Sequence, residues 1–352
     1  MENIFVLLMR KYDRKQKRAK LRSFDEYSGL PPHINTHQWA WQKPKRVWVN
    51  VLLFIVTIFS TMAAGAGFQG YSWLAMWEEP SLIFNGWPYS LAVLLILTTH
   101  EFGHYFAAVY HRMNVTLPYY IPLPIPDLFH FGTMGAFIRI KSPIPHRVAL
   151  MDVAVAGPIM SFIFSIIFLA VGYSILPDAV VVRDFIDTVH GRLGITPDQI
   201  AQDGLTLTMG KSLLFSYFND VVGGGKIPMS EIYHFPFIFA GWVGFLVTAI
   251  NLIPIGQLDG GHVVYALFGR NARYFSYSAF GALGGLTLFF YFQRGSEGIV
   301  WLPWMIILTL IGLRHPPTAN DDLPIDAKRK WFGWACIIIF LLCFAPLPVH
   351  LE

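Results

Sequence analysis

Apolar runs of about twenty residues, repeated along the chain, constrain its fold more than any other sequence feature. A helix needs about 20 apolar residues to cross the hydrocarbon core of a bilayer. Candidate spans lie near residues 47–66, 88–111, 148–174, 233–253, 274–293, 298–313 and 331–348. Only 14% of the 352 residues are charged, whereas soluble domains carry about 25%. The sequence therefore predicts a membrane all-α fold, a polytopic helical bundle of about seven spans with a short membrane-associated β segment.

Basic residues predict how these spans are oriented. Residues 1–46 form an N-terminal segment with a dense cluster of lysines and arginines between Arg10 and Arg22. Further basic groups lie at Lys43 to Arg46, Arg112 to Arg147, Arg270 and Arg273, and Lys328 to Lys330. Cytoplasmic loops carry an excess of Lys and Arg, so these groups share the cytoplasmic side if residues 251–268 do not cross fully. We expect a multi-pass protein of the cell membrane, with a basic cytoplasmic segment 1–46 followed by a polytopic membrane domain 47–352.

The basic N-terminal cluster has a simple interpretation as an anchor that contacts anionic lipid headgroups. A nucleic-acid-binding arm would also be basic, but no other feature of the sequence supports one. We therefore expect the lipid bilayer as a partner and no nucleic acid.

A proline-rich segment between the second and third apolar runs excludes a regular helix. Pro118, Pro122 and Pro124 favour extended backbone. Residues 132–141 then predict a short strand with a glycine-rich start. Such a strand could pair with an extended substrate, although a structural hairpin in a cytoplasmic loop explains the same residues equally well.

The second apolar run, from Trp87 to Tyr110, contains two histidines and a glutamate where such groups are costly. Residues His100 to His104 read His-Glu-Phe-Gly-His, an H-E-x-x-H motif. Ionisable residues inside membrane spans are rare and usually functional. On a helix the two imidazoles lie about 6 Å apart along the axis and about 40° apart around it, so both can bind one metal ion. Glu101 can then take a proton from water and pass it to the leaving amine.

A catalytic zinc site needs a third protein ligand. His111 lies about 10 Å along the helix axis from His104, which is too far for a shared ion. Asp152 lies near a span end, where a carboxylate can be solvated or can cap a helix at little cost in free energy. Asp259 follows a stretch broken by Pro254 and several glycines, and such breaks are tolerated where they line a cavity or are buried in protein. We therefore predict Asp259 as the third ligand, with a helix cap as the alternative role.

At this point the chain resembles the site-2 protease family of intramembrane zinc metalloproteases. Three motifs in the family's order carry this resemblance: His100-Glu101-x-x-His104, Ala156-Gly157-Pro158, and Asn251-x-x-Pro254 with Leu258-Asp259-Gly260. They mark a catalytic core over about residues 87–268. Many members also carry a PDZ domain or a pair of CBS domains, for which the sequence leaves no room, so we expect the compact form without them.

The resemblance implies a set of site residues. His100, His104 and Asp259 would bind one Zn²⁺ ion, and Glu101 would be the catalytic acid and base. Asn251 would position the substrate backbone or the developing oxyanion. The region over 132–141 would be the membrane-associated strand that clamps the substrate.

The sequence therefore predicts a zinc-dependent metalloendopeptidase that cleaves peptide bonds in or near transmembrane segments, as in regulated intramembrane proteolysis. Its partner would be a transmembrane protein substrate whose helix first unwinds. A membrane zinc protease of another type is one alternative, but such sites usually draw a glutamate from a later helix, and no later apolar run contains one. A catalytically inactive membrane binder or a transporter with the same broken-helix core is the other alternative. The presence of Glu101 counts against an inactive protein.

Overall fold

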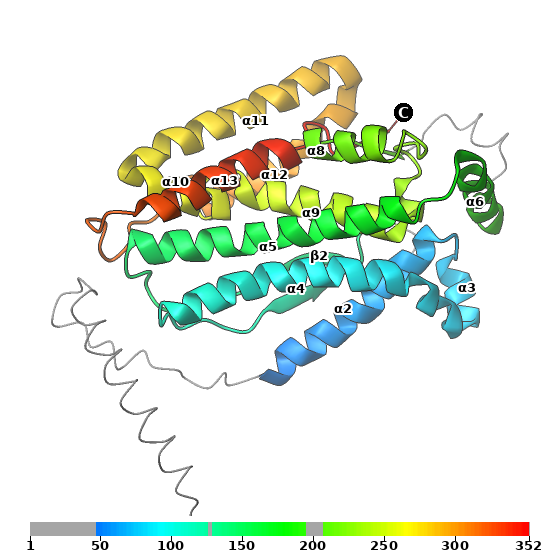
Figure 1. The fold of residues 1–352 in the computed structure, drawn as a ribbon, viewed down its shortest axis with the longest axis horizontal. Coiled ribbons are helices and arrows are strands. Elements are labelled where there is room, and N and C mark those ends of the chain that lie inside the picture. Colours follow the sequence, from blue (N-terminus) through cyan, green and yellow to red (C-terminus); the bar gives the residue numbers. More distant parts are fainter. Residues whose placement is uncertain (1–46, 126–128, 195–206, 352) are drawn as a thin grey trace, which may run out of the picture.

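The structure, a computed structural model, describes residues 47–125, 129–194 and 207–351 (Figure 1). The predicted N-terminal segment 1–46 lies outside these residues. The α-helices are α2 (Val47–Phe68), α3 (Trp73–Glu78), α4 (Trp87–Tyr110), α5 (Arg147–Ser174), α6 (Ala179–Arg192), α8 (Leu213–Ser216), α9 (Pro236–Leu252), α10 (Asp259–Phe268), α11 (Ala272–Arg294), α12 (Leu302–Ile311) and α13 (Ala327–Cys343). The short 3-10 helices are η2 (Pro80–Gly86), η4 (Ile232–His234), η5 (Gly269–Asn271) and η6 (Gly295–Trp301), and η3 (Tyr217–Val222) is a π-helix. The strands are β1 (Tyr119–Pro122), β2 (Thr133–Phe137), β3 (Leu207–Met209) and β4 (Val349–Leu351).

Four of the described helical stretches are long and apolar enough to cross a membrane. They are Val47–Phe68, Pro80–Tyr110, Arg147–Ser174 and Asp259–Arg294. Helices α9, α12 and α13 lie at the other predicted spans, but they have only 17, 10 and 17 residues. The chain is therefore a mostly helical membrane protein, and the count of about seven spans stays a prediction.

Prolines explain why the last predicted span is shorter than its apolar run. Helix α13 ends at Cys343, ahead of Pro346 and Pro348, because proline has no backbone N–H to donate to a helix. The chain then forms β4, which pairs antiparallel with β3 from Leu207↔Leu351 to Met209↔Val349. The sequence patterns do not predict this second sheet.

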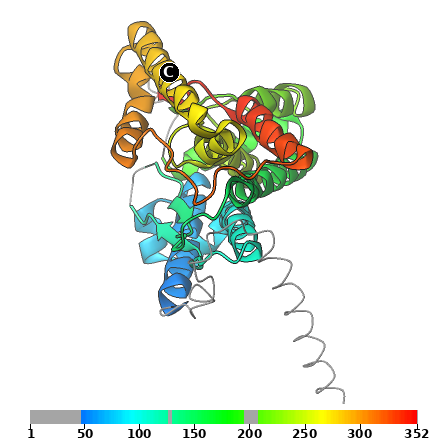
Figure 2. The same cartoon turned by 90° about the vertical axis from the view of Figure 1, so that its left-hand side faces the viewer.

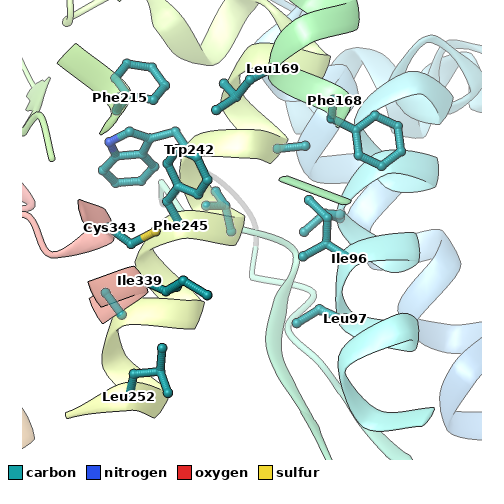
Figure 3. Packing of buried hydrophobic residues seen from close by; sticks show 14 of the residues in the cluster. Ile96, Leu97, Phe168, Leu169, Phe215, Trp242, Phe245, Leu252, Ile339 and Cys343 are labelled. Carbon is teal, nitrogen blue, oxygen red and sulfur yellow. The ribbon is translucent and has the colours of Figure 1, made fainter. Parts of the chain in front are cut away.

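Helices α4, α5 and α9 pack at the centre of the bundle, with α13 against α9 (Figure 3). Figure 2 shows α2 and α11 on opposite sides of this centre. A Cβ at Gly103 of α4 would lie 2.6 Å from the Ala156 carbonyl oxygen of α5, and one at Gly244 of α9 would lie 2.1 Å from Ser165 Oγ. Small residues let membrane helices approach this closely, so glycines hold α4 and α9 against α5. Side chains labelled in Figure 3 fill the core: Ile96, Leu97, Phe168, Leu169, Trp242, Phe245, Leu252 and Ile339.

The predicted strand region forms a small sheet between β1 and β2. Tyr119 pairs with Phe137 and Tyr120 with Ala136, in antiparallel register. The sheet is attached to α2, where the side-chain amide of Asn50 donates to the Pro118 carbonyl at 2.8 Å. It also contacts α4 through β2, so an extended segment lies beside the helix that carries H-E-x-x-H.

Candidate metal centre

The H-E-x-x-H residues lie on the inner side of α4. His100, Glu101 and His104 are only 3%, 6% and 6% exposed. Because α4 is continuous from Trp87 to Tyr110, the two histidines are one helical turn apart and project to the same side. The spacing therefore brings both imidazoles to one point, as predicted.

A tight break between α9 and α10 brings a carboxylate to the same point. Helix α9 ends at Leu252, and α10 begins at Asp259. A Cβ at Gly260 would lie 2.0 Å from the Leu252 carbonyl oxygen, and Gly256 has a φ of +56°, which favours glycine. These glycines let the chain fold back on itself, which places Asp259 beside His100 and His104 of α4.

The three predicted ligands form a compact triangle of donor atoms. His100 Nε2 lies 3.0 Å from His104 Nε2, and Asp259 Oδ2 lies 3.4 Å and 3.2 Å from these two atoms. Ligand atoms about 2.0–2.1 Å from a tetrahedral zinc ion are about 3.3–3.4 Å apart. The triangle therefore fits the donor set and the spacing that a single zinc ion needs.

Hydrogen bonds from α5 orient the two imidazoles. His104 Nδ1 lies 2.7 Å from the Val153 carbonyl oxygen, which can only accept, so Nδ1 donates this bond and Nε2 is directed at His100 and Asp259. His100 Nδ1 lies 3.1 Å from Ser161 Oγ, which in turn lies 2.8 Å from Thr248 Oγ1 on α9. Histidines that bind a metal usually donate their other ring N–H to a carbonyl or a similar group, as His104 does here.

The sequence motifs do not predict this supporting role of Ser161 and Thr248. Ser161 lies four residues after Gly157 and therefore on the same face of the helix. This spacing from the Ala156-Gly157-Pro158 motif could have marked Ser161 as a residue of the site. Nothing in the sequence marks Thr248.

Gly157 of α5 faces the imidazole of His104. A Cβ at this position would lie 2.2 Å from His104 Nε2 and 2.5 Å from the adjacent ring carbon. We expect Gly157→Ala to displace this ring, to weaken zinc binding by about 10-fold or more, and to abolish activity. Metal analysis of purified protein measures this effect. Gly281→Ala on α11, where no atom lies within 4 Å of the new Cβ, is the matched control and should bind zinc as the wild type does. Equal zinc affinity in the two variants would contradict the assigned role of Gly157.

Glu101 and Asn251 lie beside the triangle. The backbone of Ile138, just after β2, faces the Glu101 carboxylate, and both His104 and Asp259 are close enough to interact with it electrostatically. Asn251 Nδ2 lies 3.3 Å from His100 Nε2. The structure thus brings all five predicted site residues together, with Glu101 next to the extended segment.

Other polar residues of the spans lie outside the triangle. His111 Nε2 lies 2.7 Å from Asp152 Oδ2, and Arg329 Nε donates to Asp152 Oδ1 at 2.7 Å. This network joins α4, α5 and α13, which agrees with the exclusion of both His111 and Asp152 from the ligand set. His262 Nδ1 lies 2.6 Å from His315 Nε2, so its ring pairs with a histidine rather than with Asp259.

Comparison with known proteins gives a consistent result. Residues 88–291 match peptidase family M50. The chain is 31% identical over 265 residues to the probable zinc metalloprotease EGY1, chloroplastic, of Arabidopsis thaliana. This match covers 74% of the present chain and 43% of the relative. It is 25% identical to the EGY1 protein of Oryza sativa subsp. japonica (86% and 52% covered) and 27% identical to the probable zinc metalloprotease EGY2, chloroplastic, of Arabidopsis thaliana (78% and 44% covered). The chain spans about half the length of these curated relatives, and no solved structure matches it.

Proposed function

We infer the function of this chain from one premise: the chain belongs to peptidase family M50. We propose that it is a zinc-dependent intramembrane endopeptidase that hydrolyses peptide bonds in or near transmembrane segments of membrane proteins. One observation carries the proposal. His100, His104 and Asp259 converge inside membrane helices at the spacing of zinc ligands, with Glu101 beside them.

The proposed mechanism divides the work among the residues of the site. His100, His104 and Asp259 would hold the ion, and Zn²⁺, when bound, supplies Lewis-acid chemistry that polarises the scissile carbonyl and acidifies water. Glu101 accepts a proton from the attacking water and then donates it to the leaving amine. Asn251, whose amide projects towards His100, donates a hydrogen bond to the substrate carbonyl oxygen as negative charge develops on it.

The substrate enters as an extended strand. Residues of a helix hide their carbonyls in backbone hydrogen bonds, so a transmembrane substrate must unwind before hydrolysis. Strand β1 pairs with one edge of β2, and Ile138, which follows β2, faces Glu101. We propose that the substrate pairs with this segment, which would carry its scissile bond to Glu101. Met134 and Phe137, which are 69% and 48% exposed, supply apolar contacts for it.

We further propose a topology for the chain. Arg112 follows α4 and Arg147 begins α5, so these two basic residues lie at the same end of the bundle. The positive-inside rule makes this the cytoplasmic end, together with the basic segment 1–46 that precedes the membrane domain 47–352. We propose the cell membrane as its location, whereas the names of the relatives place those proteins in chloroplasts.

Metal removal tests the proposed function. We expect the purified chain in detergent or nanodiscs to cleave a membrane protein with one transmembrane segment. A chelator should abolish the cleavage, and added Zn²⁺ should restore it, because the three ligands hold the ion on which the chemistry depends. Gel analysis of a labelled substrate measures this result. Bound zinc with no cleavage of any membrane substrate would instead favour an inactive membrane binder.

A further inference from the structure

A second group of two histidines and a carboxylate lies at the end of the bundle opposite Arg112 and Arg147. His190 belongs to the last turn of α6, Glu231 immediately precedes η4, and His234 is its last residue. Figure 1 shows α6 beyond the end of α5. The proposed peptidase mechanism uses none of these three residues.

The donor atoms of this group have the spacing of a metal site. Glu231 Oε2 lies 3.1 Å from His190 Nε2 and 3.2 Å from His234 Nε2, and the two nitrogens lie 3.4 Å apart. The corresponding three distances in the triangle of His100, His104 and Asp259 are 3.0, 3.2 and 3.4 Å. Both triangles match the separation of about 3.3–3.4 Å expected around a tetrahedral zinc ion.

Neighbouring groups aim these atoms at a common point. His234 Nδ1 donates to the carbonyl oxygen of Phe68, the last residue of α2, at 2.5 Å, which leaves Nε2 directed at Glu231. Ser230 Oγ donates to Glu231 Oε1 at 3.2 Å, which leaves Oε2 directed at the histidines. Residues three apart eclipse on a 3-10 helix, which places Glu231 above His234. A cation bound between His234 Nε2 and Glu231 Oε2, which lie 3.2 Å apart, would interact favourably with both atoms.

Burial makes this arrangement costly without such a cation. His234 is fully buried, and the side chains of His190 and Glu231 are only 14% and 13% exposed. The remaining exposure is at the two outer ligands, where water can complete a four-coordinate site. Two imidazole nitrogens and one carboxylate oxygen form a donor set that Zn²⁺ binds.

We propose that His190, Glu231 and His234 bind a second Zn²⁺ ion, separate from the catalytic one. This ion joins α6 to η4, and the hydrogen bond from His234 to Phe68 connects it to the end of α2. Because His234 lies two residues before α9, the ion also fixes the start of the helix that carries Asn251 at its far end. The role is structural, and it does not depend on the proposed peptidase activity.

Metal counting of the purified chain tests this site. We expect two zinc ions per chain in the wild type and one in Glu231→Gln, which keeps the shape of the side chain but removes its charge. His190→Ala, at a partly exposed position, should also retain one ion. Asp187→Asn, an exposed acidic residue on the same helix, is the matched control and should retain two. One ion in the wild type, or an unchanged count in Glu231→Gln, would overturn the proposal. The three side chains would then form an ion pair between Glu231 and a protonated histidine.

A second measurement separates this site from the catalytic one. In Asp259→Ala, we expect added Zn²⁺ to raise the melting temperature, since the second site still binds only the folded chain. The double variant Asp259→Ala with Glu231→Gln should show no such rise. An equal rise in both proteins would overturn the proposal, and neither result depends on whether the chain cleaves a substrate.

Discussion

Glu101→Gln is expected to abolish substrate cleavage while the protein keeps its full wild-type zinc content. Glutamine has nearly the same shape as glutamate but cannot accept a proton at neutral pH. General acid–base catalysis contributes about 10²- to 10⁴-fold, and Glu101 serves in both halves of the reaction, so we expect a loss at the upper end of this range. Cleavage rate and zinc content, measured on the same preparation, give the result.

The control for this variant is Glu78→Gln, which changes an exposed glutamate on α3, outside the predicted site. It should cleave at the wild-type rate. In cells, the Glu101→Gln protein should also cause a membrane-anchored fragment of the substrate to accumulate, which membrane proteomics can identify. Full residual activity of Glu101→Gln would remove Glu101 from its role as acid and base.

Asp259→Ala is expected to lose one zinc ion per chain relative to the wild type, together with all cleavage activity. His100 and His104 alone leave the ion with two protein ligands, and catalytic zinc sites use three. The alternative role of Asp259 is to cap α10. However, Leu258 is the N-cap residue of this helix, and no side-chain cap bond is present there.

Asp259→Asn separates the two roles, because asparagine is a good helix-capping residue but lacks the negative charge of a zinc ligand. We expect it to fold like the wild type and still bind zinc much more weakly. Asp184→Ala, an exposed aspartate on α6, serves as the control. An unchanged zinc count in both Asp259 variants would remove this residue from the ligand set.

The sequence was sufficient to predict the features that depend on local spacing. The i and i+4 positions of His100 and His104 predict convergent imidazoles on any helix, and Pro254 with its neighbouring glycines predicts a break before Asp259. The family assignment from these motifs is confirmed by the match over residues 88–291 and by the relatives. The membrane character of the chain is confirmed by the four long apolar helical stretches among its described residues.

The features that the sequence could not predict depend on contacts between distant segments. The hydrogen bond from His100 to Ser161 joins residues 61 positions apart, and Glu231 lies 41 positions from His190. Periodicity carries no information about such pairs, which form only when the elements that carry them pack together. The packing role of Gly157 against His104 has the same origin, since it follows from the crossing of α4 and α5 rather than from either helix.

The most direct test of intramembrane proteolysis is to locate the bond that the purified chain hydrolyses. A protein with one transmembrane segment is reconstituted with the zinc-loaded chain in a bilayer, and mass spectrometry identifies the products. We expect a cut within or at the edge of the apolar segment, which disappears in Glu101→Gln and with a chelator. A cut confined to a soluble domain, or one that survives both treatments, would contradict this expectation.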